Sequence, residues 1–530
     1  MAANWLPPYS RIWKHSFREG SLEKVTFLFY KEGVDRPRGA CIMIEKACLH
    51  IYVFCNKSDF SEGMVIRMKS KTKLTVLGGG GVRSPFLTKS IALGAEAAGI
   101  TEVTLMDNNA EKLRKYGKIA KLVGERCNPA LRFSLTTDPE EAIRDADYII
   151  TTIRGNADEG RVFDERTALN HGVLGQETTG AGGFAMALRS IPILTGYCEL
   201  AKRLAKKDVL IFNFTNPSGL VTQALRTQGY DMVYGVCDAP SGFHKQLAAL
   251  LGVERERFTM RCWGLNHLSW FDSFQVDGED VTEQILNSPR LYKDTEMKHF
   301  DPELIALSGN LLPNEYLYFY YYSGRAVKSI LSSSKTRGET ILEINQKMHR
   351  ALDAIDIDHD LEAAFHCFML HYAMRENSYF TIETGGAPKH IDIPTVDEFI
   401  CQPDGGGYAG VALDFIKARA TGGKIQMVLS VPNNGACPYL ADGDVMELTC
   451  EIDRDGAHPV PVPEIPPMQL NLIRTIKLYE NLTVEAILEK SYEKAVKALT
   501  IHPLVNSYPV AKSLVDLYKE RYKSYIGELS

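Results

Sequence analysis

Four consecutive glycines, Gly78, Gly79, Gly80 and Gly81, constrain the fold of this chain more than any other feature. They follow an apolar segment, residues 73–77, that predicts a buried strand, and they precede a predicted helix. A second predicted strand, residues 103–107, ends on Asp107 about 26 residues after the last glycine. This order is typical of a dinucleotide-binding unit, in which backbone amides approach a pyrophosphate and the acid binds ribose hydroxyls.

The glycine motif is imperfect, because Arg83 or Ser84 stands where a third spaced glycine is expected. A glycine-rich turn in an unrelated α/β sheet is therefore the alternative. The chain nevertheless goes on alternating predicted helices with continuously apolar strands, at residues 111–127, 147–153, 185–204, 209–214 and 233–237. Apolar strands between helices are typical of a parallel sheet covered on both faces. We therefore predict an α/β protein with a Rossmann-like, doubly wound parallel sheet and a second, mixed α/β domain.

The pattern divides the chain into three predicted parts. Residues 1–69 are predicted to be a poorly ordered extension outside the functional fold, with a short docking segment as the alternative. Residues 70–235 are predicted to form the dinucleotide-binding domain. Residues 236–530 are predicted to form the mixed α/β domain, which carries catalytic and metal-binding residues and mediates oligomerisation. In this last part the sequence predicts strands at 425–431 and 445–452 and one amphipathic helix at 470–499.

Composition excludes several classes of function. A net charge of −6 and a pI of about 6.2 give no electrostatic basis for binding nucleic acid. No apolar run reaches the roughly 18 residues of a transmembrane helix, and the N-terminus lacks the layout of a signal peptide. Eleven cysteines without a repeating spacing indicate reduced thiols and a cytoplasmic protein, not a disulfide framework.

Polar side chains follow three of the predicted strands at the points where those strands end. Arg154, Asn216 and Cys237 occupy these positions. Because ligands of doubly wound sheets bind beyond the carboxyl ends of the strands, we expect the three residues to line one cleft. An arginine there suits a phosphate or carboxylate, and an amide suits sugar hydroxyls. Solvated loops and a plain turn are the alternatives for Arg154 and Asn216.

A cysteine and a histidine follow two apolar runs and form a candidate metal site. Cys237 ends one run and His267 ends the next. Thiolate and imidazole suit a borderline metal such as Mn, Fe, Co, Ni or Zn, and two protein ligands leave coordination places open, as a catalytic site requires. A lone buried cysteine that packs as a small hydrophobe is the alternative.

Tyrosines and a further arginine lie downstream. Tyr316 begins an aromatic run that ends at Tyr322, and Arg337 follows it. A tyrosine stripe is usually a packing feature, although a phenol acts as a base where a metal and other cations lower its pKa.

Taken together, these segments resemble glycoside hydrolase family 4 from about residue 73 to about residue 525. No single segment is decisive, and the match rests on their order and number. The matching segments are Leu174–Phe184, Arg189–Ile191, Cys237–Pro240, Gly264–His267, Leu312–Tyr316 and Thr336–Arg337. This family is an exception to the usual two-carboxylate mechanism of glycosidases, because it depends on NAD.

The resemblance implies a cofactor, a metal and a set of residue roles. It implies NAD and a divalent metal, usually Mn²⁺, with hydride removal at C3 of the sugar, deprotonation at C2, elimination, water addition and return of the hydride. By match to the family motifs, Cys237 and His267 are the metal ligands, Tyr316 is the C2 base and Asp238 is the acid for the leaving group. Arg154, Asn216 and Arg337 hold the substrate, a phosphorylated disaccharide or glucoside. A homodimer or homotetramer is expected.

Several interpretations of the substrate stay open. The Cys237–Asp238 pair, residues 312–316 and the Thr336–Arg337 pair look most like the 6-phospho-α-glucosidases, with maltose 6-phosphate as an example substrate. A 6-phospho-β-glucosidase or a neutral-sugar α-glycosidase of the same family is the alternative. Two departures from the family pattern, at Gly155 and at residues 323–325, are expected near the pocket. Outside the family, a net dehydrogenase of the lactate and malate type and an NAD-binding sensor remain alternatives.

Overall fold

The computed structural model describes residues 71–377, 380–384, 391–403 and 407–530, together with the backbone of three strands nearer the N-terminus. These strands are β1 (Lys24–Tyr30), β2 (Gly39–Lys46) and β3 (Leu49–Cys55), paired antiparallel in that order. They belong to one compact unit, Met1–Ser70, and Lys71–Ser530 forms another. The sequence did not indicate these strands, and the place of residues 1–69 outside the functional fold stays a prediction. The predicted boundary between residues 235 and 236 also stays a prediction.

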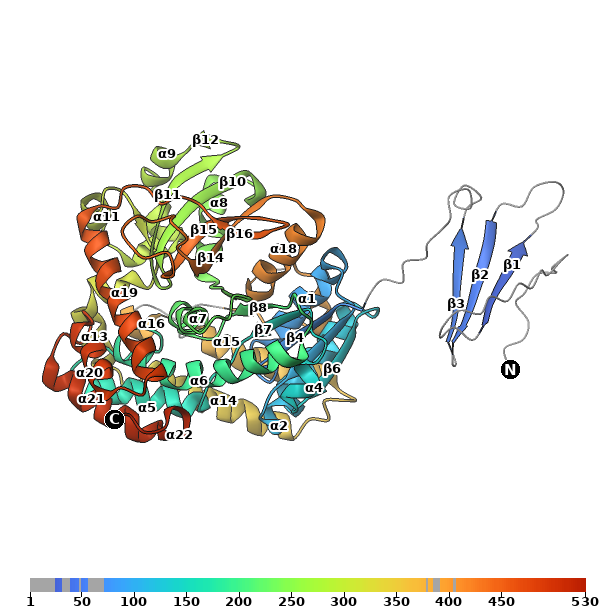
Figure 1. The fold of residues 1–530 in the computed structure, drawn as a ribbon, viewed down its shortest axis with the longest axis horizontal. Helices are drawn as coiled ribbons and strands as arrows, with labels where there is room; N and C mark the ends of the chain where they lie inside the picture. Colours follow the sequence, from blue (N-terminus) through green and yellow to red (C-terminus); the bar gives the residue numbers. More distant parts are fainter. Residues whose placement is uncertain are drawn as a thin grey trace. The chain divides into compact units, whose positions relative to one another are not determined.

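The larger unit is built on a nine-stranded sheet in the order β16-β15-β14-β9-β8-β7-β4-β5-β6 (Figure 1). Six neighbouring strands run parallel. In chain order these are β4 (Lys73–Leu77), β5 (Glu102–Met106), β6 (Arg132–Thr136), β7 (Tyr148–Thr151), β8 (Leu210–Asn213) and β9 (Val233–Gly235). Numbered from the first to the sixth, they lie in the order 3-2-1-4-5-6, which is that of dinucleotide-binding Rossmann sheets. The predicted fold class is therefore confirmed.

Helices connect the parallel strands. The connections include α1 (Ser84–Ala98), α3 (Lys118–Cys127), α5 (Ala157–Asn170), α6 (Gly180–Leu204) and α7 (Ser218–Thr227). Consecutive residues of β4 and β8 are buried although their side chains point to opposite faces, so both faces of the sheet are covered. This explains why the strands read as continuous apolar runs in the sequence.

The sheet continues with strands from the C-terminal half of the chain. β14 (Ile425–Pro432) pairs antiparallel with β9, and β15 (Val445–Asp453) and β16 (Gly456–Pro459) follow outward. The two predicted strands in this region are thus confirmed. Their pairing with β9 places residues from both predicted domains in one sheet.

A second, antiparallel sheet forms around a tight hairpin. Its main strands are β10 (Phe258–Leu265) and β11 (Leu268–Val276), and β12 (Glu279–Asp280) and β13 (Leu312–Pro313) pair with β11. β10 packs against β15 of the first sheet. The indole rings of Trp263 and Trp270 stack with centroids 5.5 Å apart, and both side chains are buried in the core.

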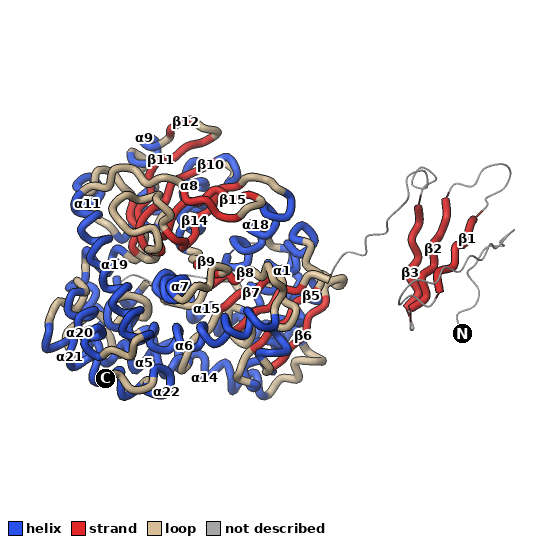
Figure 2. Tube along the Cα trace, viewed as in Figure 1, coloured by secondary structure: helices blue, strands red, loops and turns tan. Residues whose placement is uncertain are grey.

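Helices complete the larger unit (Figure 2). Those near the cavity are α12 (Leu317–Tyr321), α13 (Ser323–Ser332), α14 (Arg337–Asp353), α15 (Leu361–Asn377) and α16 (Thr381–Thr384).

The prediction of a single helix at 470–499 is wrong, because the structure has two helices there, α19 (Pro467–Leu488) and α20 (Tyr492–Ile501). Lys490 adopts a positive φ of 57° and Ser491 caps α20, so the chain turns between them. Among the residues that the structure describes, no helix has the length and apolarity needed to cross a membrane.

Candidate active site

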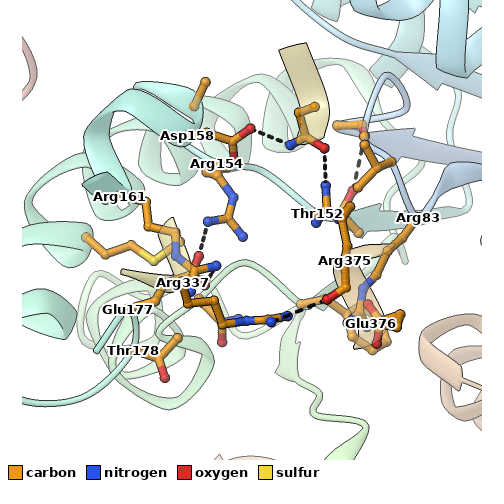
Figure 3. A pocket seen from close by; sticks show the side chains of 18 of the residues that line it. Arg83, Thr152, Arg154, Asp158, Arg161, Glu177, Thr178, Arg337, Arg375 and Glu376 are labelled. Atoms are coloured by element: carbon orange, nitrogen blue, oxygen red, sulfur yellow. Dashed lines mark hydrogen bonds and ion pairs between the residues drawn. The ribbon is translucent and has the colours of Figure 1, made fainter. Parts of the chain in front are cut away.

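A cavity of about 1840 Å³ opens at the carboxyl ends of the parallel strands (Figure 3). This volume exceeds that of a typical site for one small molecule, about 300–1,000 Å³, and suits a dinucleotide beside a second ligand. Most of the residues predicted from sequence line it: Gly78, Gly80, Gly81, Asp107, Arg154, Asn216, Asp238, Tyr316 and Arg337. Arg154 and Asn216 thus line one cavity at the strand ends, as expected, whereas Cys237, the third residue expected there, does not line it.

Three predicted residues, Gly79, Cys237 and His267, are not among those that line the cavity. Cys237 precedes Asp238 in the chain, and the His267 ring stacks against Tyr316. Both candidate metal ligands therefore adjoin the cavity through a neighbour that lines it.

The glycine turn is fastened to the end of β5. The N–H groups of Gly78 and Gly79 both donate to the Met106 carbonyl oxygen at 2.8 Å. Gly78 has a φ of 99°, and a Cβ atom on Gly79 would lie 2.7 Å from the Leu105 Cβ. These positions therefore need glycine. The helix α1 begins at Ser84 with Arg83 as its N-cap, and no side chain caps it. The Ser84 N–H donates to the Gly81 carbonyl oxygen at 3.0 Å, and Pro85 has no N–H to donate.

Two backbone hydrogen bonds hold the Asp107 carboxyl group beside the glycine turn. Its Oδ2 accepts a hydrogen bond from the Gly80 N–H at 3.1 Å, and its Oδ1 accepts one from the Asn109 N–H at 2.9 Å. Burial raises the pKa of Asp107, and these two hydrogen bonds oppose that rise. The carboxyl group thus lies beside the glycine turn, at the wall of the cavity.

The candidate metal ligands lie side by side. The Cys237 sulfur, just after β9, is 3.6 Å from Nε2 of His267, which occupies the β10–β11 turn with a φ of 63°. Nδ1 of His267 is 3.0 Å from Oγ1 of Thr178, which orients the ring. Burial lowers the pKa of His267 to about 3, so its imidazole is neutral, as a metal ligand must be. Burial, with Glu447 and Asp238 nearby, raises the pKa of the Cys237 thiol.

The donor pair fits one metal ion. With bonds of about 2.3 Å to sulfur and about 2.1 Å to nitrogen, bond angles of about 90–110° place the two donors about 3.1–3.6 Å apart. The observed separation of 3.6 Å lies at the upper end of that range. Within the described residues, no group of three or more His, Cys, Asp and Glu side chains could hold a metal. A metal here would take its remaining ligands from substrate and water.

Tyr316 lies directly over the imidazole ring. The two ring planes are inclined by 6° with centroids 3.6 Å apart. Tyr316 precedes α12 and lines the cavity, and so do Tyr318 and Phe319, which are buried. Part of the aromatic run therefore forms the wall of the cavity while it packs into the core.

Arg154 does not stand alone at the end of β7. It forms an ion pair with Glu177, and Arg161 pairs with the same carboxylate at 2.8 Å and with Glu165 at 2.7 Å. Burial would raise the pKa of Glu177, but Arg154 and Arg161 lower it to about 2. In the sequence Glu177 belongs to a polar loop, and nothing there indicates that an arginine after β7 and another on α5 reach it.

Arg337 is the first residue of α14, and Thr336 and Glu339 cap this helix reciprocally. Nη1 of Arg337 donates to the Arg375 carbonyl oxygen at 3.3 Å. The Arg375 guanidinium donates to Asn345 at 2.7 Å, and Asn345 donates in turn to Asp158 at 2.6 Å (Figure 3). This chain of contacts brings α5, α14 and α15 together at the cavity, and the sequence held no pattern that would reveal Arg375.

Two further predicted residues have partners that the sequence did not show. Asp238 forms an ion pair with Arg83 at 3.2 Å, so the residue that interrupts the glycine motif reaches the candidate acid. The Asn216 carbonyl oxygen accepts a hydrogen bond from Ser190 at 2.9 Å. Two departures from the family pattern were expected near the pocket. The first, Gly155, lines the main cavity. In the second, residues 323–325, only Arg325 lines that cavity, and Ser323 and Gly324 line a separate hollow.

The fold and the site define a class: a Rossmann-like α/β protein with a thiol–imidazole pair next to its dinucleotide turn. Comparison with known proteins narrows this class. A family model described as "Family 4 glycosyl hydrolase" matches residues 73–253, and one described as "Family 4 glycosyl hydrolase C-terminal domain" matches residues 262–505. The 6-phospho-beta-glucosidase BglT of Thermotoga maritima is 30% identical over 86% of this chain and 99% of its own. The chain belongs to glycoside hydrolase family 4 and is a hydrolase of that family, as the resemblance implied.

Other relatives differ in the phosphoglucoside on which they act. A maltose-6'-phosphate glucosidase of Fusobacterium mortiferum is 27% identical over 85% of this chain and 98% of its own. Among solved structures, a T. maritima 6-phospho-beta glucosidase with manganese, NAD⁺ and glucose-6-phosphate has a TM-score of 0.71 and 28% identity, covering 87% of this chain and 100% of its own. A 6-phospho-alpha-glucosidase from gut microorganisms, with NAD and glucose-6-phosphate, has a TM-score of 0.72 and 27% identity over the same shares.

Proposed function

We propose that this chain hydrolyses 6-phosphoglucosides, with NAD⁺ and a divalent metal such as Mn²⁺ as cofactors. The observation that carries the proposal is the cluster of a thiol, an imidazole and a phenol: the His267 ring lies 3.6 Å from the Cys237 sulfur and 3.6 Å from the Tyr316 ring centroid. The dinucleotide turn opens into the same cavity. A net dehydrogenase of the lactate and malate type has no use for this thiol–imidazole pair.

The chain's own residues take distinct roles. Bound NAD⁺ would accept and return a hydride at C3 of the sugar, and the metal would polarise the resulting carbonyl and acidify the C2 proton. The glycine turn and Asp107 would hold the nucleotide, and Cys237 and His267 would hold the metal. The Tyr316 phenol would remove the C2 proton, and Asp238 would supply a proton to the departing oxygen.

Arg154, Asn216 and Arg337 are proposed to bind the sugar phosphate. Both arginines and the asparagine line the cavity. Arg154 pairs with Glu177, and Arg337 acts on the carboxyl groups of Glu177 and Glu383, so neither arginine is favoured over the other for direct contact with a phosphate. A guanidinium suits this group because its donors match two phosphate oxygens.

The proposed substrate is a 6-phospho-α-glucoside, on the strength of the Cys237–Asp238 pair and its likeness to that branch. Relatives of both anomeric types resemble the chain to a similar degree, so the anomer needs a direct test. Release of p-nitrophenol from the α and β aryl 6-phosphoglucosides, side by side, should favour the α anomer. It should require both NAD⁺ and Mn²⁺ and leave no NADH.

Each contrary outcome has a definite meaning. Preference for the β anomer would assign the chain to the 6-phospho-β-glucosidases, and preference for an unphosphorylated glucoside would reject the phosphate site. Accumulation of NADH with substrate would identify a net dehydrogenase. Full turnover in nucleotide-free protein with EDTA would reject the mechanism. A homodimer or homotetramer stays the expected assembly, which light scattering would measure.

A further inference from the structure

A buried carboxyl group lies behind the candidate metal ligands. Glu447 is on β15 and is 1% exposed. Its Oε1 accepts a hydrogen bond from Nδ2 of Asn266 at 2.9 Å, and its Oε2 accepts one from Oγ of Ser269 at 2.7 Å. Both of these donors are neutral groups. Burial of a carboxyl group without a cationic partner costs free energy, which hydrogen bonds to the group offset. Both hydrogen-bond donors to Glu447 belong to the hairpin that carries His267.

The first branch from Glu447 leads to the metal site. Asn266 directly precedes His267, whose Nε2 lies 3.6 Å from the Cys237 sulfur, and the Asn266 side chain acts on the Cys237 thiol to lower its pKa. Its Oδ1 accepts a hydrogen bond from the Gly219 N–H at 3.2 Å, and a Cβ atom on Gly219 would lie 2.7 Å from the Asn266 Cβ. The Asn266 side chain is therefore held between Gly219 and Glu447, and Glu447 is the partner that the C-terminal strands supply.

The second branch leads to the candidate base. Oγ of Ser269 accepts a hydrogen bond from Nδ2 of Asn314 at 3.3 Å, and the Asn314 N–H donates to the Ser269 carbonyl oxygen at 2.9 Å. Oδ1 of Asn314 in turn accepts a hydrogen bond from the Tyr316 N–H at 3.1 Å. Ser269 and Asn314 are both buried. This branch fixes the backbone from which the Tyr316 ring extends over His267.

We infer that Glu447 is a positioning residue that holds the Cys237 sulfur and the Tyr316 phenol in fixed relation, through Asn266 on one side and through Ser269 and Asn314 on the other. The roles of Cys237 and Tyr316 rest on the proposed function, whereas the network itself is geometric. Groups that orient metal ligands typically alter metal affinity by about 10–100-fold when removed. One carboxyl group thus serves the metal and the proton transfer together.

The test measures Mn²⁺ affinity separately from turnover, in the full-length protein, by the electron paramagnetic resonance signal of free Mn²⁺. Glu447→Ala should weaken Mn²⁺ binding by about 10–100-fold and lower kcat even at saturating Mn²⁺. Glu447→Gln should retain most of both, because its amide oxygen can accept from Asn266 while its NH₂ donates to Ser269. Ser269→Ala breaks only the second branch, so it should lower kcat and leave Mn²⁺ affinity unchanged.

Thr449→Val is the matched control. Thr449 is buried two residues further along β15 on the same face, and its Oγ1 accepts a hydrogen bond from the Cys262 N–H at 2.8 Å. This variant loses a buried hydrogen bond outside the network, so its Mn²⁺ affinity should equal that of the wild type.

A folded Glu447→Ala variant that binds Mn²⁺ as tightly as Thr449→Val does would overturn the inference. If Glu447→Ala does not fold, an unchanged kcat in Ser269→Ala would overturn it. Absence of Mn²⁺ binding by the wild type would overturn the proposed function as well.

Discussion

At the scale of single residues, the half-buried thiol of Cys237 has a different neighbour from the buried thiols of Cys198, Cys262, Cys437 and Cys450. It lies 3.6 Å from an imidazole nitrogen that burial keeps neutral. Cys237→Ser and His267→Ala should each weaken Mn²⁺ binding by more than about 100-fold, since removal of a ligand should exceed the effect of removing a group that only orients one. Titration of free Mn²⁺ measures this without turnover.

A buried cysteine outside the site provides the control for that prediction. Cys198 on α6 is 1% exposed and has no place in the site. Cys198→Ser should therefore leave Mn²⁺ affinity unchanged. Wild-type Mn²⁺ affinity in Cys237→Ser would show that the sulfur is a packing group after all, which is the alternative that the sequence left open.

The Glu177 carboxylate should make the stability of the fold depend on pH in the acid range. Arg154 and Arg161 lower its pKa to about 2 from the ordinary 4.5. A lowered carboxylate pKa stabilises the folded state above the unfolded pKa, and this contribution is lost as the pH falls from about 4.5 to about 2. A difference of this size corresponds to about 3 kcal/mol. Urea unfolding at several pH values should show Glu177→Gln less stable than the wild type at pH 7, with a gap that narrows below pH 4.5. A gap that is constant from pH 7 to pH 3 would contradict the assigned ion pairs.

Arg337 offers a test of phosphate binding that leaves the ion pair between Arg154 and Glu177 in place. Arg337→Ala should raise KM for a 6-phosphoglucoside by roughly 10–10²-fold, from the loss of one charge-assisted contact of about 1.5–3 kcal/mol. Arg337→Lys keeps the charge but loses the forked geometry, so its KM should lie between those of the wild type and Arg337→Ala. Steady-state kinetics with phosphorylated and unphosphorylated glucosides measures the effect. An equal rise in KM for both substrates would show that Arg337 shapes the pocket without contacting the phosphate.

At the scale of elements, the glycine turn and the strand β5 act as one unit. Gly80 donates its N–H to Asp107, and a Cβ atom on Gly80 would lie 2.9 Å from that carboxyl group. Gly80→Ala should therefore displace Asp107 and weaken NAD⁺ binding, as measured by quenching of protein fluorescence. Gly196→Ala is the control, since Gly196 lies within α6 with nothing within 4 Å of its added Cβ. That change should stabilise the protein by up to about 1 kcal/mol and leave NAD⁺ affinity unchanged.

Elements with a strong local signal could be predicted from the sequence. The apolar runs at β4, β5, β7, β8 and β9 were identified because a doubly covered strand needs side chains of one kind throughout. The helices α19 and α20 were merged, because their apolar spacing continues across a turn that depends on the backbone at Lys490. The site residues at strand ends followed from topology. Glu177, Arg375 and Glu447 did not, since each acquires its role from partners more than 15 residues away in the sequence.

At the scale of the whole molecule, β14–β16 join the NAD-binding half to the C-terminal half. β14 pairs with β9, the strand that Cys237 follows, and β15 supplies Glu447. No periodicity in the sequence reveals such a pairing, because an antiparallel strand can join either edge of a sheet or form a sheet of its own. The larger unit, Lys71–Ser530, is accordingly one compact body.

This organisation makes opposite predictions for the two ends of the chain. A chain that begins at Met68 retains every strand of the nine-stranded sheet and every proposed site residue, so it should unfold at the same temperature as the larger unit of the full-length protein and bind NAD⁺ equally well. A chain that ends before β14 loses three strands of that sheet together with Glu447. The exposed edge of β9 and the uncovered apolar surface should leave it without a cooperative unfolding transition. Calorimetry and NAD⁺ titration of both chains decide the matter: loss of NAD⁺ binding in the chain that begins at Met68 would make residues 1–67 part of the functional fold.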